Sequence, residues 1–512
     1  MRSIQKKGKI MRKHFISILG TGNYEKAVYY CEKAGEKAVY ETSYIQEAVL
    51  KLKFDEWNED DRITVFVTEK SMARNWEDYT YSAKEREDAG KKGITLPEKN
   101  KGLKGILEKE YEPYLDKIDE CIIPVGATED ELWSIFQIMY SHIGDGEELY
   151  IDITHSLRNI PIQMLSVIAF ARVVKKVTVS GIYYGAFEVG NRNEQGIKEA
   201  PIFDLITFLD ILDWSQAAAS FVKYGDSDQI VDLYRKNSKR LPSKAIELYK
   251  IISELQNITR GLETSRGYCN PNLIRENQER GRINSGISSG NSTLESYFAY
   301  KKFYKELMKK DREQDNPNQQ KNMIKPLGEL MNVINDDVRN FNVESNLDLG
   351  LAAIKWAIDH KRTQQGFTAL EETIKTFLCS YYGLDETKEA ERELGKHVGN
   401  ALARQKQKEQ VRELTQEVRE RAYEEWKEWN KGKTDEECQK AYEIIMDIPL
   451  EMVETIHNVG QCRNSMNHFG YSNAGQFSGE KLEKNLKKYY YNFVDNMMQM
   501  KEKNSRSESE KS

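Results

Sequence analysis

Short apolar runs alternate with amphipathic segments through the first 200 residues of the chain. Runs of four to seven residues rich in Val, Ile, Phe and Tyr are typical of strands, and apolar residues every three or four positions are typical of helices. Strands are predicted over 15–19, 38–41, 63–68, 120–125, 149–153 and 177–183, and a helix over 44–52. Because strands spaced by helices form right-handed βαβ units, this part predicts an α/β domain with a mostly parallel sheet.

The pattern becomes helical after Pro201, and strand-like runs disappear. Helices are predicted over 204–221, 243–262, 351–360 and 450–459. Loops are predicted over 266–292, which is rich in Gly, Asn, Arg and Ser, and over the charged segment 309–321. The charged run 405–431 is expected to be a solvated helix whose Lys and Arg side chains can guide RNA. The low-complexity segment 501–512 is expected to be disordered.

Length, charge and cysteine use narrow the class of protein. A chain of 512 residues is long enough for two or three domains. The net charge of −6 gives no general attraction to nucleic acid, so any RNA contact needs a local basic patch. Six scattered cysteines without CxxC spacing argue against a structural zinc site or a disulfide framework and fit a reducing cytoplasm. No apolar run is long enough to cross a membrane, and Met11 is a candidate alternative start.

The segment Asp152–Pro161 gathers unusual chemistry at one turn. It reads Asp-Ile-Thr-His-Ser-Leu-Arg-Asn-Ile-Pro and lies between a predicted strand and a long apolar helix. Ligands of open α/β sheets bind outside the carboxyl ends of strands and near helix N-termini. The segment is therefore a candidate catalytic or anion-binding loop. A Ser–His–Asp hydrolase is disfavoured, because Asp152, His155 and Ser156 lie within five residues and triad members normally come from separate elements.

A second polar turn, Gly20-Thr21-Gly22-Asn23-Tyr24, follows the first predicted strand. Its glycines fit either a ligand-binding loop or an ordinary turn. No third glycine follows at the dinucleotide spacing, so a nicotinamide site is unfavoured. Asp152 likewise fits either a ligand contact or a side chain that ties its own turn together.

A third constellation, Arg463-Asn464-Ser465-Met466-Asn467-His468, follows a predicted helix near the C-terminus. An Arg and a His suit metal-free RNA cleavage. The imidazole can move the proton of an attacking ribose 2′-hydroxyl, and the guanidinium can neutralise charge on the phosphate. Five residues of helix turn through about 500°, so the two side chains point the same way only if the helix ends or bends between them. The alternative is a surface pair at a helix end.

Together these motifs resemble a known family. The Gly20–Tyr24 turn and the Asp-Ile-Thr-His-Ser-Leu-Arg stretch look like the ligand-binding motifs of the CRISPR-associated Rossmann-fold (CARF) sensor domain. Arg463-Asn464 and His468 are similar to the Arg–x4–6–His motif of HEPN ribonucleases. Ser156 departs from the pattern, since many relatives carry Gly there. The order of sensor, helices and nuclease resembles the ancillary ribonucleases of type III CRISPR systems.

The resemblance implies a cytoplasmic, metal-independent endoribonuclease that cleaves single-stranded RNA in antiviral defence. It also implies that the enzyme is activated when a cyclic oligoadenylate, with tetra-adenylate favoured, binds a CARF homodimer or higher oligomer. It implies no metal and no cofactor. The implied organisation is an extension (1–12), a Rossmann-like CARF domain (13–203), an all-α linker (204–345), an all-α HEPN domain (346–500) and a tail (501–512). Catalysis falls to Arg463, His468 and Asn464, and ligand binding to Gly20, Thr21, Gly22, Asn23, Thr154, His155, Ser156, Leu157 and Arg158.

Two other functions stay open at this point. The chain can be a non-catalytic nucleotide-sensing regulator, or its sensor domain can also degrade the cyclic ligand. Thr68 to Lys70 and Thr128 end neighbouring strands and are weaker ligand candidates. His360 and Arg362 are either a solvated face or a support for the nuclease site.

Overall fold

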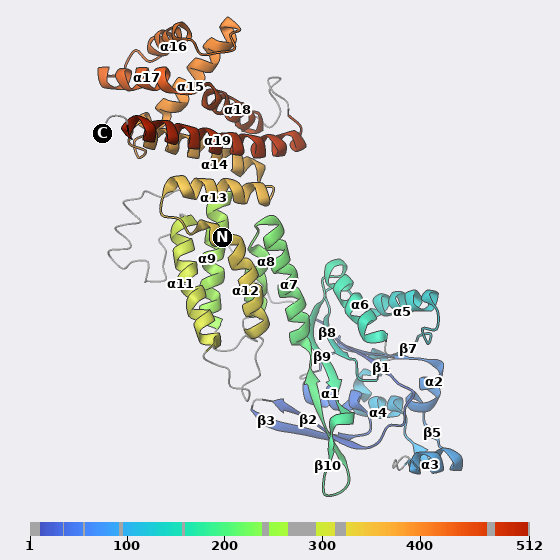
Figure 1. The fold of residues 1–512 in the computed structure, drawn as a ribbon. Coiled ribbons are helices and arrows are strands. Elements are labelled where there is room, and N and C mark those ends of the chain that lie inside the picture. The colour runs from blue at the N-terminus through green and yellow to red at the C-terminus, as the bar shows by residue number, and fades with distance from the viewer. Residues whose placement is uncertain are drawn as a thin grey trace, which may run out of the picture. The chain divides into compact units, whose positions relative to one another are not determined.

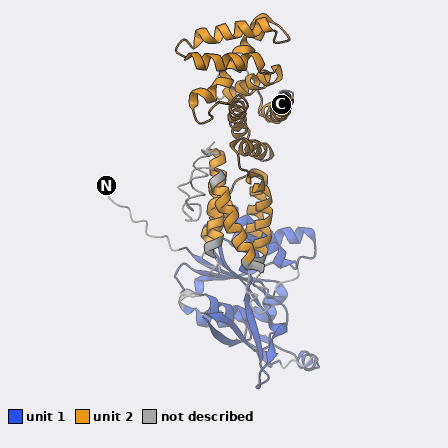
Figure 2. Cartoon of the chain, turned by 60° about the vertical axis from the view of Figure 1, so that its left-hand side comes forward, with its two compact units in different colours: residues 1–210 blue, residues 211–512 orange. Residues whose placement is uncertain are grey.

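The computed structural model describes residues 11–33, 35–54, 57–91, 96–155, 159–237, 245–264, 293–312, 324–467 and 477–509. The chain divides into two compact units, residues 1–210 and residues 211–512 (Figure 2). The division falls inside helix α7 (Ile206–Tyr224), seven residues beyond the boundary expected at 203. The further boundary expected at 345 stays a prediction.

Unit 1 is built on one large mixed sheet (Figure 1). Its strand order is β3-β2-β11-β9-β8-β1-β4-β7, and β10 pairs with β11. The strands are β1 (Lys13–Leu19), β2 (Ala27–Lys33), β3 (Glu36–Thr42), β4 (Arg62–Val67), β7 (Ile118–Ile122), β8 (Glu148–Asp152), β9 (Thr178–Gly185), β10 (Asn191–Arg192) and β11 (Lys198–Asp204). A separate hairpin joins β5 (Tyr79–Thr80) to β6 (Lys99–Asn100).

The central strands β9-β8-β1-β4-β7 are all parallel, which confirms the predicted Rossmann-like architecture. From β1 the chain builds outward through β4 and β7, and then returns to the other side of β1 for β8 and β9. The order therefore reverses between β1 and β8, where His14 lies opposite Leu149 and Ser17 opposite Asp152. Such a reversal leaves a crevice at the carboxyl ends of the two strands.

Helices cover both faces of this sheet, which explains the nearly continuous apolar runs of its central strands. One core holds α1 (Ile45–Lys53), α4 (Leu103–Glu110) and the π-helical turn η1 (Met72–Trp76) against the sheet. The other holds α5 (Glu129–His142) and α6 (Ile160–Val174). The shorter helices α2 (Glu69–Ser71) and α3 (Ala83–Gly90) and the 3-10 turns η2 (Glu112–Lys117) and η3 (Phe187–Val189) complete the unit.

Two of the longer strands, β2 and β11, were not predicted from the sequence, nor were the two-residue strands β5, β6 and β10. β2 pairs antiparallel with β3, and β11 pairs antiparallel with β9 and parallel with β2. β11 lies where the sequence predicts the change to helix, and it contains Pro201, a residue that is unusual inside a sheet. Pro201 carries no N–H, but its carbonyl accepts from Ala186 N at 2.9 Å, so pairing continues on that side.

Unit 2 is helical in all its described secondary structure except the turn η6 (Arg339–Phe341), as predicted. After α7 come α8 (Asp228–Asn237), α9 (Ala245–Glu263), α11 (Thr293–Arg312), α12 (Ile324–Val338), α13 (Asn346–Asp359), α14 (Thr363–Tyr381), α15 (Glu389–Glu409), α16 (Gln416–Trp429), α17 (Asp435–Asp447), α18 (Leu450–Asn467) and α19 (Gly479–Ser509). In the described parts, no helix is both long and apolar enough to span a bilayer.

Two apolar cores organise these helices. Helices α7–α12 form one, and α14–α19 form the other. Helix α13 contributes Trp356 to the first and Ile354 to the second, so it is shared by both. Helix α19 continues to Ser509, into the segment expected to be disordered. Met500, just before that segment, is buried, and Lys503 within it donates to the Asp447 carboxylate at 2.7 Å.

Candidate functional site

The strand reversal brings the two candidate sensor loops into contact. Gly20 follows β1 directly, and Thr154-His155 comes shortly after β8. A Cβ atom at Gly20 would lie 3.0 Å from the His155 carbonyl oxygen and 3.2 Å from the His155 Cβ. A side chain at position 20 would therefore crowd the His155 loop, and glycine lets the two loops pack closely. Gly22 meets no such restriction, since a Cβ there has no neighbour within 4 Å.

Asp152 ties its own turn to the sheet. Its carboxylate is fully buried and accepts from Thr154 N at 3.0 Å, Thr154 Oγ1 at 2.5 Å and Ser17 Oγ at 2.7 Å. Ser17 in turn accepts from Gln46 Nε2 at 3.1 Å, and Thr154 Oγ1 accepts from Gly185 N at 2.8 Å. Burial raises the pKa of Asp152 despite these bonds. Of the two roles open to Asp152, a ligand contact or a structural tie, this geometry supports the structural tie.

The His155 imidazole is held as a neutral ring. Burial lowers its pKa to about 4. The ring meets the edge of Tyr24 with centroids 4.4 Å apart, and the Tyr24 hydroxyl accepts from Gly20 N at 3.0 Å. His155 Nε2 is buried and has no hydrogen-bond partner among the described residues. A buried ring nitrogen of this kind is suited to accept or donate one hydrogen bond to a ligand.

The turn η1 clamps the glycine loop from the other side. Asn75 Nδ2 donates to Gly20 O at 2.9 Å and to Gly22 O at 3.0 Å. The Arg74 guanidinium donates to Asn23 Oδ1 at 2.5 Å. π-helical turns are rare and are often found at functional sites. Sequence reasoning missed both residues, because nothing in their local spacing marks them.

The remaining predicted sensor residues divide into three groups. Thr21, Gly22 and Asn23 are exposed and accessible to a ligand. Thr68 and Thr128, the weaker candidates, instead cap helices, since Thr68 Oγ1 accepts from Ser71 N and Thr128 Oγ1 accepts from Glu131 N, both at 3.2 Å. Ser156, Leu157 and Arg158 lie outside the described residues.

The candidate nuclease residue Arg463 lies near the end of α18 and is oriented by a carboxylate from α14. Its Nη1 donates to the Glu371 oxygens at 3.2 and 3.3 Å. The Glu371 side chain is only 7% exposed, whereas that of Arg463 is 29% exposed. The guanidinium is therefore fixed from its buried side while part of it faces solvent.

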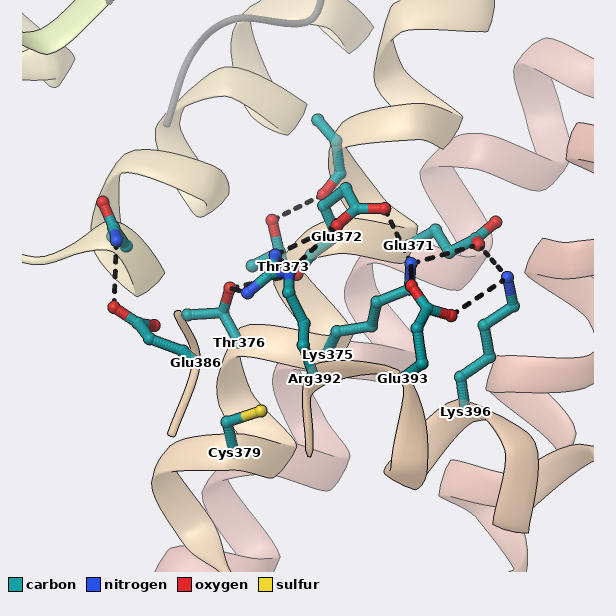
Figure 3. Close-up of polar contacts among 12 residues, drawn as sticks. Glu371, Glu372, Thr373, Lys375, Thr376, Cys379, Glu386, Arg392, Glu393 and Lys396 are labelled. Carbon is teal, nitrogen blue, oxygen red and sulfur yellow. Dashed lines mark hydrogen bonds and ion pairs between the residues drawn. The ribbon is translucent and has the colours of Figure 1, made fainter. Parts of the chain in front are cut away.

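Glu371 belongs to a network of carboxylates and cations between α14 and α15 (Figure 3). Lys396 donates to Glu371 Oε1 at 2.6 Å, and Lys375 lies 3.7 Å from the same oxygen. Although burial alone would lower the pKa of Lys375, its bonds with Glu372 and Glu393 raise it. The network therefore holds charged groups in fixed positions beside Arg463. Its sequence signal, Glu-Glu-x-x-Lys at helical spacing, was not recognised.

The other predicted catalytic residues are less defined. Asn464 is exposed on α18, next to Arg463. Helix α18 continues through Asn467, so it does not end between Arg463 and Asn467. His468 lies outside the described residues. His360 Nδ1 donates to Trp356 O at 2.8 Å, and the ring is buried beside Asp337, which favours a structural role.

In the described part of the chain, no cluster of His, Cys, Asp and Glu side chains could hold a metal ion. No protein-family model matches the sequence. The chain is 28% identical over 411 residues to CRISPR-associated protein MJ1674 of Methanocaldococcus jannaschii. The match covers 73% of this chain and 55% of that protein, so the chain spans about half the length of its curated relative. This chain is thus similar to a CRISPR-associated protein.

Proposed function

We propose that the protein is an endoribonuclease of CRISPR defence, switched on by a cyclic oligoadenylate. One observation carries the nuclease part of the proposal. The buried Glu371 fixes a partly exposed Arg463 in the last turns of α18, five positions before His468 in the sequence. A guanidinium held by a carboxylate is prepared to neutralise charge on a phosphate. The similarity to a CRISPR-associated protein supports the biological setting.

The proposed reaction is transesterification within the RNA strand. The ribose 2′-oxygen attacks the adjacent phosphorus while His468 of one subunit accepts its proton. The bond from phosphorus to the 5′-oxygen breaks, and that oxygen takes up a proton. The products are a 2′,3′-cyclic phosphate and a 5′-hydroxyl. Arg463 stabilises the charge on the phosphate oxygens, Asn464 orients the phosphate, and no metal takes part.

The proposed sensor is the crevice between β1 and β8. The exposed loop residues Thr21, Gly22 and Asn23, together with Thr154 and His155, contact the phosphates and adenines of the ring. Ser156, Leu157 and Arg158 are assigned to the same ligand, and the helix N-terminus that follows favours anions. Two copies share one ring, because a cyclic tetra-adenylate and a homodimer have the same two-fold symmetry.

The decisive experiment measures cleavage of labelled single-stranded RNA by the full chain, with and without cyclic tetra- and hexa-adenylate, in EDTA. We expect ligand-dependent cleavage, and a loss of about 100-fold or more in His468→Ala and Arg463→Ala with ligand binding unchanged. Glu371→Gln should lower kcat more than it changes KM, because it loosens Arg463 without removing it. His155→Ala should instead raise the ligand concentration needed for activation.

Two further results would test the alternatives to this function. Absence of cleavage with every cyclic oligoadenylate, while the ligand still binds, would favour a non-catalytic regulator. Chromatography of the ligand after long incubation tests whether the sensor domain also degrades its activator, and a linear product would show that it does.

A further inference from the structure

One solvent-facing stripe of α15 leads away from Arg463. Lys396, Asn400 and Arg404 follow each other at four-residue spacing, and none of the three is buried. Residues four apart lie on one face of a helix. Eight residues of helix rise by about 12 Å, which is the length of about three or four nucleotides at the ~3.4 Å spacing of a stacked strand.

The near end of the stripe joins the nuclease site. Arg463 Nη1 and Lys396 Nζ both bind Glu371 Oε1, at 3.2 and 2.6 Å. The two nitrogens therefore lie at most 5.8 Å apart, the sum of those distances. Lys396 is 25% exposed, so its ammonium is anchored by a carboxylate and still reaches solvent. Two cations this close can bind adjacent phosphates of one strand.

The far end of the stripe carries an exposed indole. Trp429, the last residue of α16, is 71% exposed, whereas Trp426 in the same helix is buried. The Arg404 guanidinium lies over the Trp429 ring, 5.1 Å from its centroid. Arg404 also forms an ion pair with Glu425, whose Oε1 lies 3.9 Å from Arg404 Nε, longer than a hydrogen bond. The Arg404 charge also adds to burial in lowering the pKa of His457 on α18, so this end borders α18 as well.

We infer that single-stranded RNA leaves the nuclease site along this stripe, with phosphates bound by Lys396 and Arg404 and a base stacked on Trp429. Single-strand sites combine cations that follow the backbone with aromatic rings on which bases stack, and stacking is tolerant of sequence. A phosphate contact at Lys396 places the strand, and Trp429 secures it about 12 Å further on. The inference rests on the proposed nuclease function, and it assigns residues that the Arg463–His468 motif does not contain.

The test measures binding of fluorescent RNA of about twelve nucleotides, a length within known single-strand site sizes, to the full chain. Every ribose carries a 2′-O-methyl group, so the strand cannot be cleaved. Trp429→Ala should weaken binding by about tenfold, and Trp429→Phe should restore most of it, because a ring can still stack. Lys396→Gln and Arg404→Gln should each lower the slope of log affinity against log salt by about 0.7.

Matched controls lie elsewhere in the same unit. Tyr491→Ala removes an aromatic ring that is 52% exposed on α19. Lys503→Gln removes a cation that pairs with Asp447. Asp447 lies just before the start of α18, and Arg463 lies about 20 Å further along that helix, so this cation is far from Arg463. Neither control should change affinity or salt slope.

The inference is overturned if Trp429→Ala and Arg404→Gln bind the RNA like the wild type with unchanged salt slopes. Thermal denaturation confirms folding of each variant. Since the assay needs no cleavage, it is independent of the proposed catalysis. Loss of RNA binding in the stripe variants would support RNA binding along the stripe, whatever the result for His468→Ala. Normal cleavage by His468→Ala would instead overturn the proposed catalytic residues.

Discussion

At the scale of single residues, the Asp152–His155 turn separates two roles that the sequence left open. Asp152 makes three hydrogen bonds within the fold and is fully buried, so it holds the loop. His155 contacts Gly20 and Tyr24 and keeps a buried Nε2 without a partner among the described residues. The polar turn thus combines a structural acid with a ring placed to meet a ligand.

The lowered pKa of His155 predicts a pH-dependent stability. Its folded pKa is about 4 and its ordinary value is 6.5, so between these pH values the unfolded chain binds more protons. The stabilisation is therefore complete above pH 6.5 and is lost as the pH falls toward 4, by up to about 3 kcal/mol. In His155→Phe, the free energy of unfolding should fall less between pH 7 and pH 4.5 than in the wild type.

Urea denaturation of both proteins at each pH measures this difference. Comparing the two cancels the titration of His14 and other groups, since their surroundings are the same in both proteins. Parallel pH curves for wild type and His155→Phe would show that His155 is not buried as a neutral ring. Sequence alone marked His155 as chemically important, but not its protonation state, which depends on Tyr24 and the packing around it.

At the scale of elements, the π-helical turn η1 makes the glycine loop dependent on Asn75. Asn75→Ala removes two hydrogen bonds to the Gly20 and Gly22 carbonyls and leaves those oxygens without this donor. We expect the substitution to cost about 1–3 kcal/mol of the free energy that holds the Gly20–Gly22 loop in place. Affinity for cyclic tetra-adenylate should fall by about tenfold or more, while RNA cleavage at saturating ligand stays near the wild-type rate.

Isothermal titration with the cyclic ligand checks this, with Asn193→Ala as the matched control. Asn193 Oδ1 accepts from Gln195 N and Ile197 N, both at 3.0 Å, in a turn between β10 and β11. Its loss should leave ligand affinity unchanged. Equal affinity in wild type and Asn75→Ala would mean that η1 does not position the ligand loop.

The elements also show where sequence reasoning succeeds and where it stops. The central strands were predicted because both of their faces are covered, which makes their sequences continuously apolar. β2 and β11 were missed because their sequences mix polar and apolar residues, as in Ala27–Lys33. The parallel pairing between them also joins segments that lie far apart in the chain. Arg463 was recognised by its motif, but Glu371 lies 92 residues away, and only the packing of α14 on α18 brings them together.

At the scale of the whole molecule, the proposed mechanism requires two copies, and helix α6 offers a surface for pairing. Ile162, Leu165 and Val173 lie on one face of α6 and are 71%, 40% and 68% exposed. Contiguous exposed apolar side chains usually mark an interaction surface. Helix α6 also follows the His155 loop directly, so a partner bound there would approach the ligand crevice.

Charges on this face should therefore separate the copies. In a two-fold dimer each substitution occurs twice, so Ile162→Glu with Val173→Glu should place four carboxylates in one apolar contact. We expect sedimentation analysis to show a dimer for the wild type and a monomer for the variant. Ligand-dependent RNA cleavage should be lost as well, because a ring shared by two sensors and a nuclease site built from two subunits both need the dimer.

Val189→Glu, at a position 67% exposed on η3, is the control and should leave both properties unchanged. A variant that remains dimeric and fully active would show that the copies pair through another face, and that α6 does not link ligand binding to cleavage.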